Sequence, residues 1–140
     1  MADEETTVQE CARSANEIGA EDIVVIDLRG ISSIADYFVI CTGTSMPHLK
    51  AIQRDIEKGV EAAISEIPIR KDGKADSMWV VLDYADVLVH IFHKEMRDVY
   101  NLENLWSDAP RVTYDFIDES KKAAAAPIAD LADEMESEDV

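Results

Sequence analysis

The sequence has few cysteines, no long apolar run and no targeting segment. Its two cysteines, Cys11 and Cys41, are spaced in no zinc-binding or redox pattern, and Cys41 lies in an apolar stretch typical of a buried thiol. No apolar run approaches the roughly 20 residues that a membrane helix needs. The acidic N-terminus has neither the basic nor the apolar part of a signal peptide. These absences predict a reduced, soluble, cytoplasmic protein.

Basic side chains are also scarce. The chain has 13 lysines and arginines against 30 acidic residues, for a formal net charge of -17. A field of this sign repels phosphate backbones and anionic membranes, and it attracts basic proteins. We therefore expect no membrane contact and no direct nucleic-acid specificity. The charge is equally compatible with a basic protein partner and with solubility alone.

The sequence lacks a paired-carboxylate motif for a divalent cation. Such a pair needs period-two spacing on one strand, so that both side chains point to one face. Asp83 and Asp86 are instead three residues apart across a predicted turn, and Trp79 and Val81 occupy the alternating positions before Asp83. A P-loop and a nucleophile motif are likewise missing. We expect no catalytic residue, no metal and no cofactor.

One turn keeps an enzymatic alternative open. Gly43-Thr44-Ser45 follows a predicted strand and precedes a predicted helix, where free backbone N–H groups favour an anion. On a nucleotidyltransferase-like enzyme such a turn would hold the phosphates of a nucleotide. Without a metal-binding pair, a structural turn and helix cap is the favoured interpretation.

The three histidines form no ligand set. His48 falls in the first turn of a predicted helix, and His90 alternates with Leu88 and Phe92 on one face of its strand. No cysteine or carboxylate completes a metal site with them or with His93 at strand or helix spacing. For His90 the pattern favours a structural, hydrogen-bonding role over that of a metal ligand or general base.

Hydrophobic periodicity predicts one α/β domain over residues 1–112. Thr7 and Glu10 have capping-box spacing before a helix over 8–17, and Ser45 and Pro47 are placed to start a long amphipathic helix. The predicted strands are 23–28, 37–42, 79–82 and 87–92. The short connections predict antiparallel pairing within the first two strands and within the last two, and a helix directly after residue 92.

The character of the chain changes after Pro110. Residues 113–140 contain nine acidic and two basic side chains, and they carry -7 of the net charge. Two short pieces, 114–117 and 128–135, have apolar residues suited to docking or local helix, but neither can bury enough surface to be stable alone. We expect most of this acidic tail to be mobile.

Large aromatic residues concentrate between Trp79 and Trp106. On the last helix Arg97, Tyr100 and Glu103 follow one another at three-residue intervals, beside an apolar stripe that faces inward. Tyrosine and arginine are enriched at protein interfaces, and Trp79 and Tyr84 flank the same region from the hairpin. The alternative is that the tryptophans only complete the core, an alternative as strong as the interface for Trp79 and favoured for Trp106.

Several uncommon combinations in this order resemble the ribosomal silencing factor family, also called Iojap. The resemblance covers roughly Thr7 to Val112 and leaves the acidic tail outside. The segments that carry it are Asp27-Leu28, Ser32 through Ser45 with His48, Trp79 through Asp83, Asp86 through His90, and Arg97 through Trp106.

The resemblance implies an α/β fold like that of the nucleotidyltransferases, a mixed sheet flanked by helices, without their catalysis. It also implies binding to ribosomal protein number fourteen of the large subunit, obstruction of subunit joining, repression of translation when nutrients are short, and a homodimer in the free state. Matched position by position, the family's partner-facing surface corresponds to Trp79, Asp83, Tyr84, Tyr100 and Glu103, and His90 and Arg97 match motif positions with a supporting structural role. A nucleotide-binding enzyme and a dimeric scaffold are the competing functions.

Overall fold

A computed structural model describes residues 4–73, 77–100, 104, 106–114 and 116, and for 98–100 it describes the backbone only. The elements are α1 (Glu4–Glu17), β1 (Glu21–Asp27), β2 (Tyr37–Gly43), α2 (Met46–Ile64), β3 (Arg70–Asp72), β4 (Trp79–Asp83), β5 (Val87–His93), α3 (Lys94–Tyr100) and β6 (Arg111–Val112). The predicted strands and helices are thus recovered within a few residues. No helix among these residues combines the length and apolar character needed to cross a membrane.

The strands form one mixed sheet in the order β3-β4-β5-β2-β1-β6. β1 pairs with β2, and β4 with β5, in antiparallel fashion, as the short connections predict. The central pair β2 and β5 is parallel, and the long connection that this requires contains α2, β3 and β4. The predicted fold class, a mixed α/β sheet flanked by helices, is confirmed.

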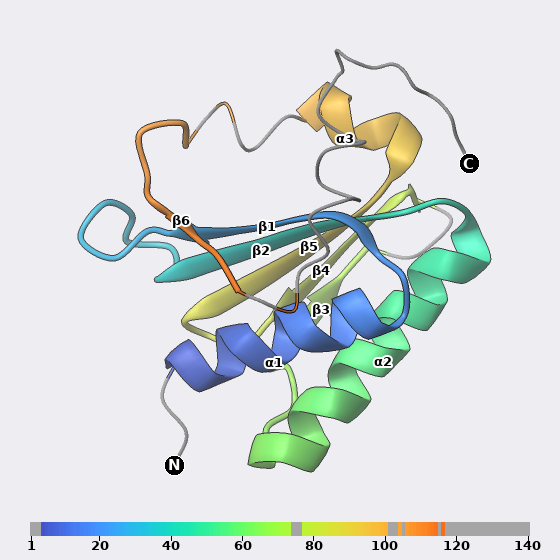
Figure 1. Cartoon of the computed structure of the whole chain (residues 1–140), viewed down its shortest axis with the longest axis horizontal. Helices are drawn as coiled ribbons and strands as arrows, with labels where there is room; N and C mark the ends of the chain where they lie inside the picture. Colours follow the sequence, from blue (N-terminus) through green and yellow to red (C-terminus); the bar gives the residue numbers. More distant parts are fainter. Residues whose placement is uncertain (1–3, 74–76, 101–103, 105, 115, 117–140) are drawn as a thin grey trace.

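The two long helices cover one face of the sheet, and α3 lies on the other side (Figure 1). The larger core lies between the sheet and α1 and α2, and it includes Val8, Ile52, Val25, Val39 and Val89. A second cluster lies on the opposite face around Ile26, Phe38, Ile40 and Phe92, with the half-buried Trp79, Leu88, Met96 and Trp106 packed against it. Alternation along each strand distributes the side chains between these two faces.

Helix α1 begins earlier than the sequence pattern predicts. The helix starts at Glu4, so Thr7 lies inside it and is no N-cap. The Thr7 hydroxyl instead donates a hydrogen bond to Glu66 Oε1 at 3.2 Å, near the C-terminal end of α2. The capping-box prediction is therefore wrong. The Thr7 side chain makes a tertiary contact with Glu66 instead of capping α1.

Helix α2 starts as predicted. Ser45 is the N-cap, and its hydroxyl oxygen accepts from the His48 backbone N–H at 3.2 Å. The His48 ring joins the two helices, because Nδ1 accepts from the Thr44 N–H and Nε2 donates to the Ile18 carbonyl, both at 3.0 Å. His48 therefore has a structural role.

Two short strands and one docked piece complete the described chain. β3 pairs with β4, and β6 pairs with β1; both are too short and too polar to show period-two alternation. Tyr114 and Phe116 pack against the larger core, so part of the predicted docking piece 114–117 is confirmed. The expected mobility of the tail falls on residues 117–140, which lie outside the described residues.

Candidate partner-binding face

The sheet face opposite α1 and α2 is only partly covered where β4 and β5 run. Trp79, Val81 and Asp83 share this face because they alternate along β4, and Leu88 joins them from β5. All four side chains are half-buried. We call these four residues the open face. Val81 and Leu88 are not among the site residues predicted from the sequence. Period-two alternation along the two strands was a signal that could have placed them on the same face as Trp79.

Trp79 is both a core residue and a surface residue. Its ring stacks on Phe92 with 5.0 Å between centroids and an interplanar angle of 23°. The indole Nε1 donates to His90 Nδ1 at 3.3 Å. These contacts hold one side of the ring while the residue stays half-buried, so Trp79 packs against the core without being sealed in it, and its interface role stays a prediction.

His90 supports the open face from within. The residue is 6% exposed, and its ring meets the edge of Phe38 with 4.6 Å between centroids. The indole N–H of Trp79 can only donate, so Nδ1 of His90 is the acceptor and Nε2 carries the proton. Nε2 is buried without a hydrogen-bond partner in the described part of the chain. Burial lowers the pKa of His90 to about 4, which keeps the ring neutral at pH 7.

Asp83 closes β4 at the edge of the open face. One carboxylate oxygen accepts from the Ala85 N–H at 2.8 Å, which fixes a turn in which Ala85 has a φ of 75°. The other lies 3.5 Å from a guanidinium nitrogen of Arg70 on β3. The carboxylate therefore shapes the hairpin and pairs with Arg70 at the edge of the sheet.

Tyr84 lies on the wrong side for an outward-facing ring. It follows Asp83 in the chain, so its side chain turns toward the larger core under α1 and α2, where it is 7% exposed. Its hydroxyl is buried without a hydrogen-bond partner among the described residues, and burial raises its pKa well above the usual value. The expectation that Tyr84 projects outward beside Trp79 is wrong.

Arg97 anchors α3 to the sheet. It is 5% exposed, although its spacing predicts a stripe shared with Tyr100. Its guanidinium donates to Thr42 Oγ1 on β2 and, at 2.9 Å, to the carbonyl oxygen of Asp22 on β1. These contacts agree with a supporting role. Glu103 and the side chain of Tyr100 lie outside the described residues.

The turn at Gly43-Thr44-Ser45 is occupied by structural contacts. A Cβ at Gly43 would lie 2.9 Å from Leu49 Cδ2, so this glycine lets α2 pack close to the end of β2. The Thr44 N–H already donates to the His48 ring. A phosphate at this turn would have to displace that hydrogen bond.

Three carboxylates meet at the other end of β2, which the sequence prediction missed. Ligand atoms of Glu4, Asp36 and Asp86 all lie within 4.8 Å of one another. A hydrogen bond with Asp36 raises the pKa of Glu4. Asp36 precedes β2 and Thr44 follows it, so this cluster and the glycine turn are separated by the strand's length, about 20 Å. A nucleotidyltransferase site would need both at one end.

Known proteins resemble the chain over most of its length. The family model described as "Ribosomal silencing factor during starvation" matches residues 1–139, so the match extends into the tail that the sequence resemblance leaves outside. Ribosomal silencing factor RsfS of Bacillus subtilis is 44% identical over 106 residues, which are 75% of this chain and 88% of that protein.

Two further relatives differ in origin. A crystal structure of a Bacillus halodurans protein has a TM-score of 0.67 and 34% identity, and the alignment covers 79% of this chain and 99% of that one. A mouse protein named "Mitochondrial assembly of ribosomal large subunit protein 1" is 33% identical over 63% of this chain and 40% of its own length. From the family match and the identity to the Bacillus subtilis protein, the chain belongs to the ribosomal silencing factor family.

Proposed function

We propose that this protein binds the large ribosomal subunit through ribosomal protein number fourteen, at the surface that meets the small subunit. In the cytoplasm the bound protein would block subunit joining and repress translation when nutrients are short. The mechanism requires no reaction, because a bound protein that occupies the space of the small subunit competes with it directly.

The open face is the observation that supports this proposal. It places Trp79, a half-buried ring on a rigid strand, on the same side as the Asp83 carboxylate. Interfaces are anchored by large aromatic side chains surrounded by polar groups, and such a ring loses little conformational entropy on binding. Tyr100 ends α3 on this side of the sheet, and we propose Tyr100 and Glu103 as further contacts.

The charge of the chain supports the same partner. Ribosomal proteins are basic because they contact RNA, and a net charge of -17 steers a cationic protein toward the chain. The mouse relative is named for assembly of the ribosomal large subunit, which supports a large-subunit partner for this chain. Tyr84, buried on the other side, is left out of the proposed contact surface.

Subunit joining tests the proposal. Purified large subunits are incubated with the protein, small subunits are added, and the joined ribosomes are measured in a sucrose gradient. We expect joined ribosomes to fall as the protein concentration rises, and Tyr100→Ala to weaken this effect. Lys58→Ala, on the exposed side of α2, is the control and should inhibit like the wild type. Unchanged joining at saturating protein would refute the proposal.

We also propose that the free protein is a homodimer. A scaffold that only self-associates would use the same exposed ring, so the two functions need separate measurements. Sedimentation equilibrium of Trp79→Ala gives self-association, and binding to large subunits gives partner contact. A variant that loses dimerisation and keeps full subunit binding would assign Trp79 to the dimer.

An enzymatic alternative has a direct test. Isothermal titration with a nucleoside triphosphate and Mg²⁺ should give no binding heat, because the glycine turn and the three carboxylates lie at opposite ends of β2. If saturable heat is seen, the two variants locate its source. Heat that is unchanged in Thr44→Ala and lost in Asp36→Asn would point to a cation site instead.

A further inference from the structure

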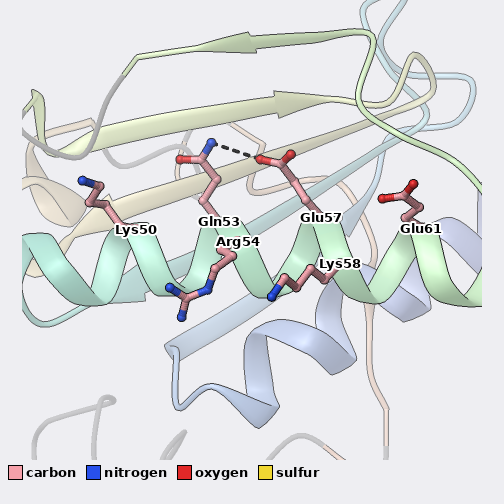
Figure 2. Close-up of a pocket in the computed structure, with 6 residues that line it drawn as sticks. All are labelled: Lys50, Gln53, Arg54, Glu57, Lys58 and Glu61. Atoms are coloured by element: carbon pink, nitrogen blue, oxygen red, sulfur yellow. Dashed lines mark hydrogen bonds between the residues drawn. The ribbon is translucent and has the colours of Figure 1, made fainter.

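A line of positive charge runs along α2 in this acidic protein. Lys50, Arg54 and Lys58 follow one another at four-residue intervals along α2, and all three are exposed. We call them the α2 ridge. Figure 2 shows Arg54 and Lys58 pointing away from Gln53 and Glu57, whereas Lys50 points to the side of Gln53. The ridge borders a shallow surface hollow. The three ridge residues line it together with Gln53, Glu57 and Glu61.

The acidic neighbours of the ridge are partly engaged elsewhere. Glu57 accepts from Gln53 at 3.1 Å and lies 3.4 Å from Lys71 Nζ of β3. Arg54 makes an ion pair at 3.5 Å with its chain neighbour Asp55, and its side chain is 59% exposed. Within the described residues, no ion pair of Lys50 or Lys58 is seen. The ridge therefore has positive charge left to meet an anionic partner.

The described chain ends beside the same helical layer. The Phe116 carbonyl accepts from Asn16 Nδ2 on α1 at 2.8 Å, and the Arg13 guanidinium lies 5.7 Å from the centre of the Phe116 ring. Helices α1 and α2 lie side by side (Figure 1), close enough that a Cβ at Gly59 would lie 2.1 Å from Ser14 Oγ. The described chain therefore ends at Phe116 on the surface of α1, one helix away from the ridge.

The sequence that follows has the complementary charge. Residues 117–140 are 24 residues with eight acidic and two basic side chains, and residues 128–140 contain six acidic side chains and no basic one. An extended chain of this length spans up to about 80 Å, whereas packed helix axes are only about 8–10 Å apart. The segment can reach any part of α2.

We propose that the acidic segment 128–139 binds the α2 ridge of its own chain. Tethering gives such a segment an effective concentration of about millimolar order, which suits a weak electrostatic contact. RNA is the competing anionic occupant, and the net charge of -17 repels it. The contact neutralises the ridge and keeps α2 from RNA phosphates, while the open face on the other side of the sheet stays accessible.

A spin label near the C-terminus tests this contact. Ser137→Cys places one reactive thiol in the segment, whereas Cys11 and Cys41 are buried and burial raises the pKa of both thiols, so they resist labelling. Amide signals of the full-length protein are then compared with the label oxidised and reduced. At about 20 mM salt we expect the oxidised label to broaden the amide signals of residues 50–58 most, lowering their intensity at least about twofold. Near 500 mM salt the intensity should recover, because the charges are screened.

Two variants with equal charge change provide the control. Arg54→Glu with Lys58→Glu should remove the broadening, whereas Arg70→Glu with Lys94→Glu should leave it, and circular dichroism checks that both fold. Broadening that is absent from α2, centred on β4 and β5, or equally affected by both variants would overturn the proposal. A second result would also overturn it: a ten-nucleotide uridine RNA shifts the amide signals of residues 50–58 as strongly in the full-length chain as in a chain ending at residue 127.

Discussion

The indole of Trp79 donates a hydrogen bond to Nδ1 of His90 at 3.3 Å, across the β4–β5 hairpin. This bond fixes both the tautomer of the histidine and the orientation of the half-buried tryptophan ring. A residue on the candidate partner surface is thereby held by a buried residue that the partner does not need to touch.

For partner binding, the hydrogen-bond acceptor at position 90 should matter more than the size of the side chain there. We expect His90→Leu to release the Trp79 ring and weaken binding to large subunits by roughly tenfold, about 1.4 kcal/mol. His90→Asn offers a carbonyl oxygen near the place of Nδ1 and should retain more of the affinity. Affinity is measured by co-sedimentation, and tryptophan fluorescence reports the ring environment. Equal losses in both variants would show that only packing is involved.

His90 should make stability depend on pH. Its pKa is about 4 in the folded chain and about 6.5 when unfolded, so the unfolded chain binds more protons between these values. The free energy of unfolding should therefore fall as the pH is lowered from 6.5 to 4, by up to about 3 kcal/mol. Urea titrations at several pH values should show this slope in the wild type and a shallower one in His90→Leu. Parallel curves would contradict the assigned burial.

Removing the hydroxyl of Tyr84 should not destabilise the protein. The hydroxyl is buried without a partner among the described residues, so Tyr84→Phe removes a polar group that gains nothing from the fold. We expect the free energy of unfolding to stay equal or rise by about 1 kcal/mol. Chemical denaturation measures this change. A loss above 1 kcal/mol would indicate a hydrogen bond to this hydroxyl.

Arg97 should stabilise the attachment of α3. Arg97→Met keeps much of the buried volume but leaves Thr42 Oγ1 and the Asp22 carbonyl without this donor. We expect a loss of about 2 to 3 kcal/mol in the free energy of unfolding. Hydrogen exchange should quicken in α3 before it does in α1, and uniform exchange across both helices would argue against a local anchor.

The sequence predicts those features that local patterns determine. The strand pairs, the Ser45 cap and the order of elements follow from periodicity and turn residues. The burial of Arg97 depends on tertiary contacts with β1 and β2, which no local spacing contains. The inward side of Tyr84 follows from alternation after Asp83, a local signal that the prediction from aromatic clustering did not use. The Thr7 contact with Glu66 likewise joins residues 59 positions apart, and helix-cap rules cannot anticipate it.

Co-sedimentation of Trp79→Ala with purified large subunits tests the central proposal most directly. The wild-type protein should pellet with large subunits and not with small ones, and Trp79→Ala, shown to be folded by circular dichroism, should pellet at least about tenfold more weakly, since an anchoring aromatic contributes over about 1.4 kcal/mol. Equal pelleting of the two proteins would contradict the assignment of the open face as the ribosome-binding surface.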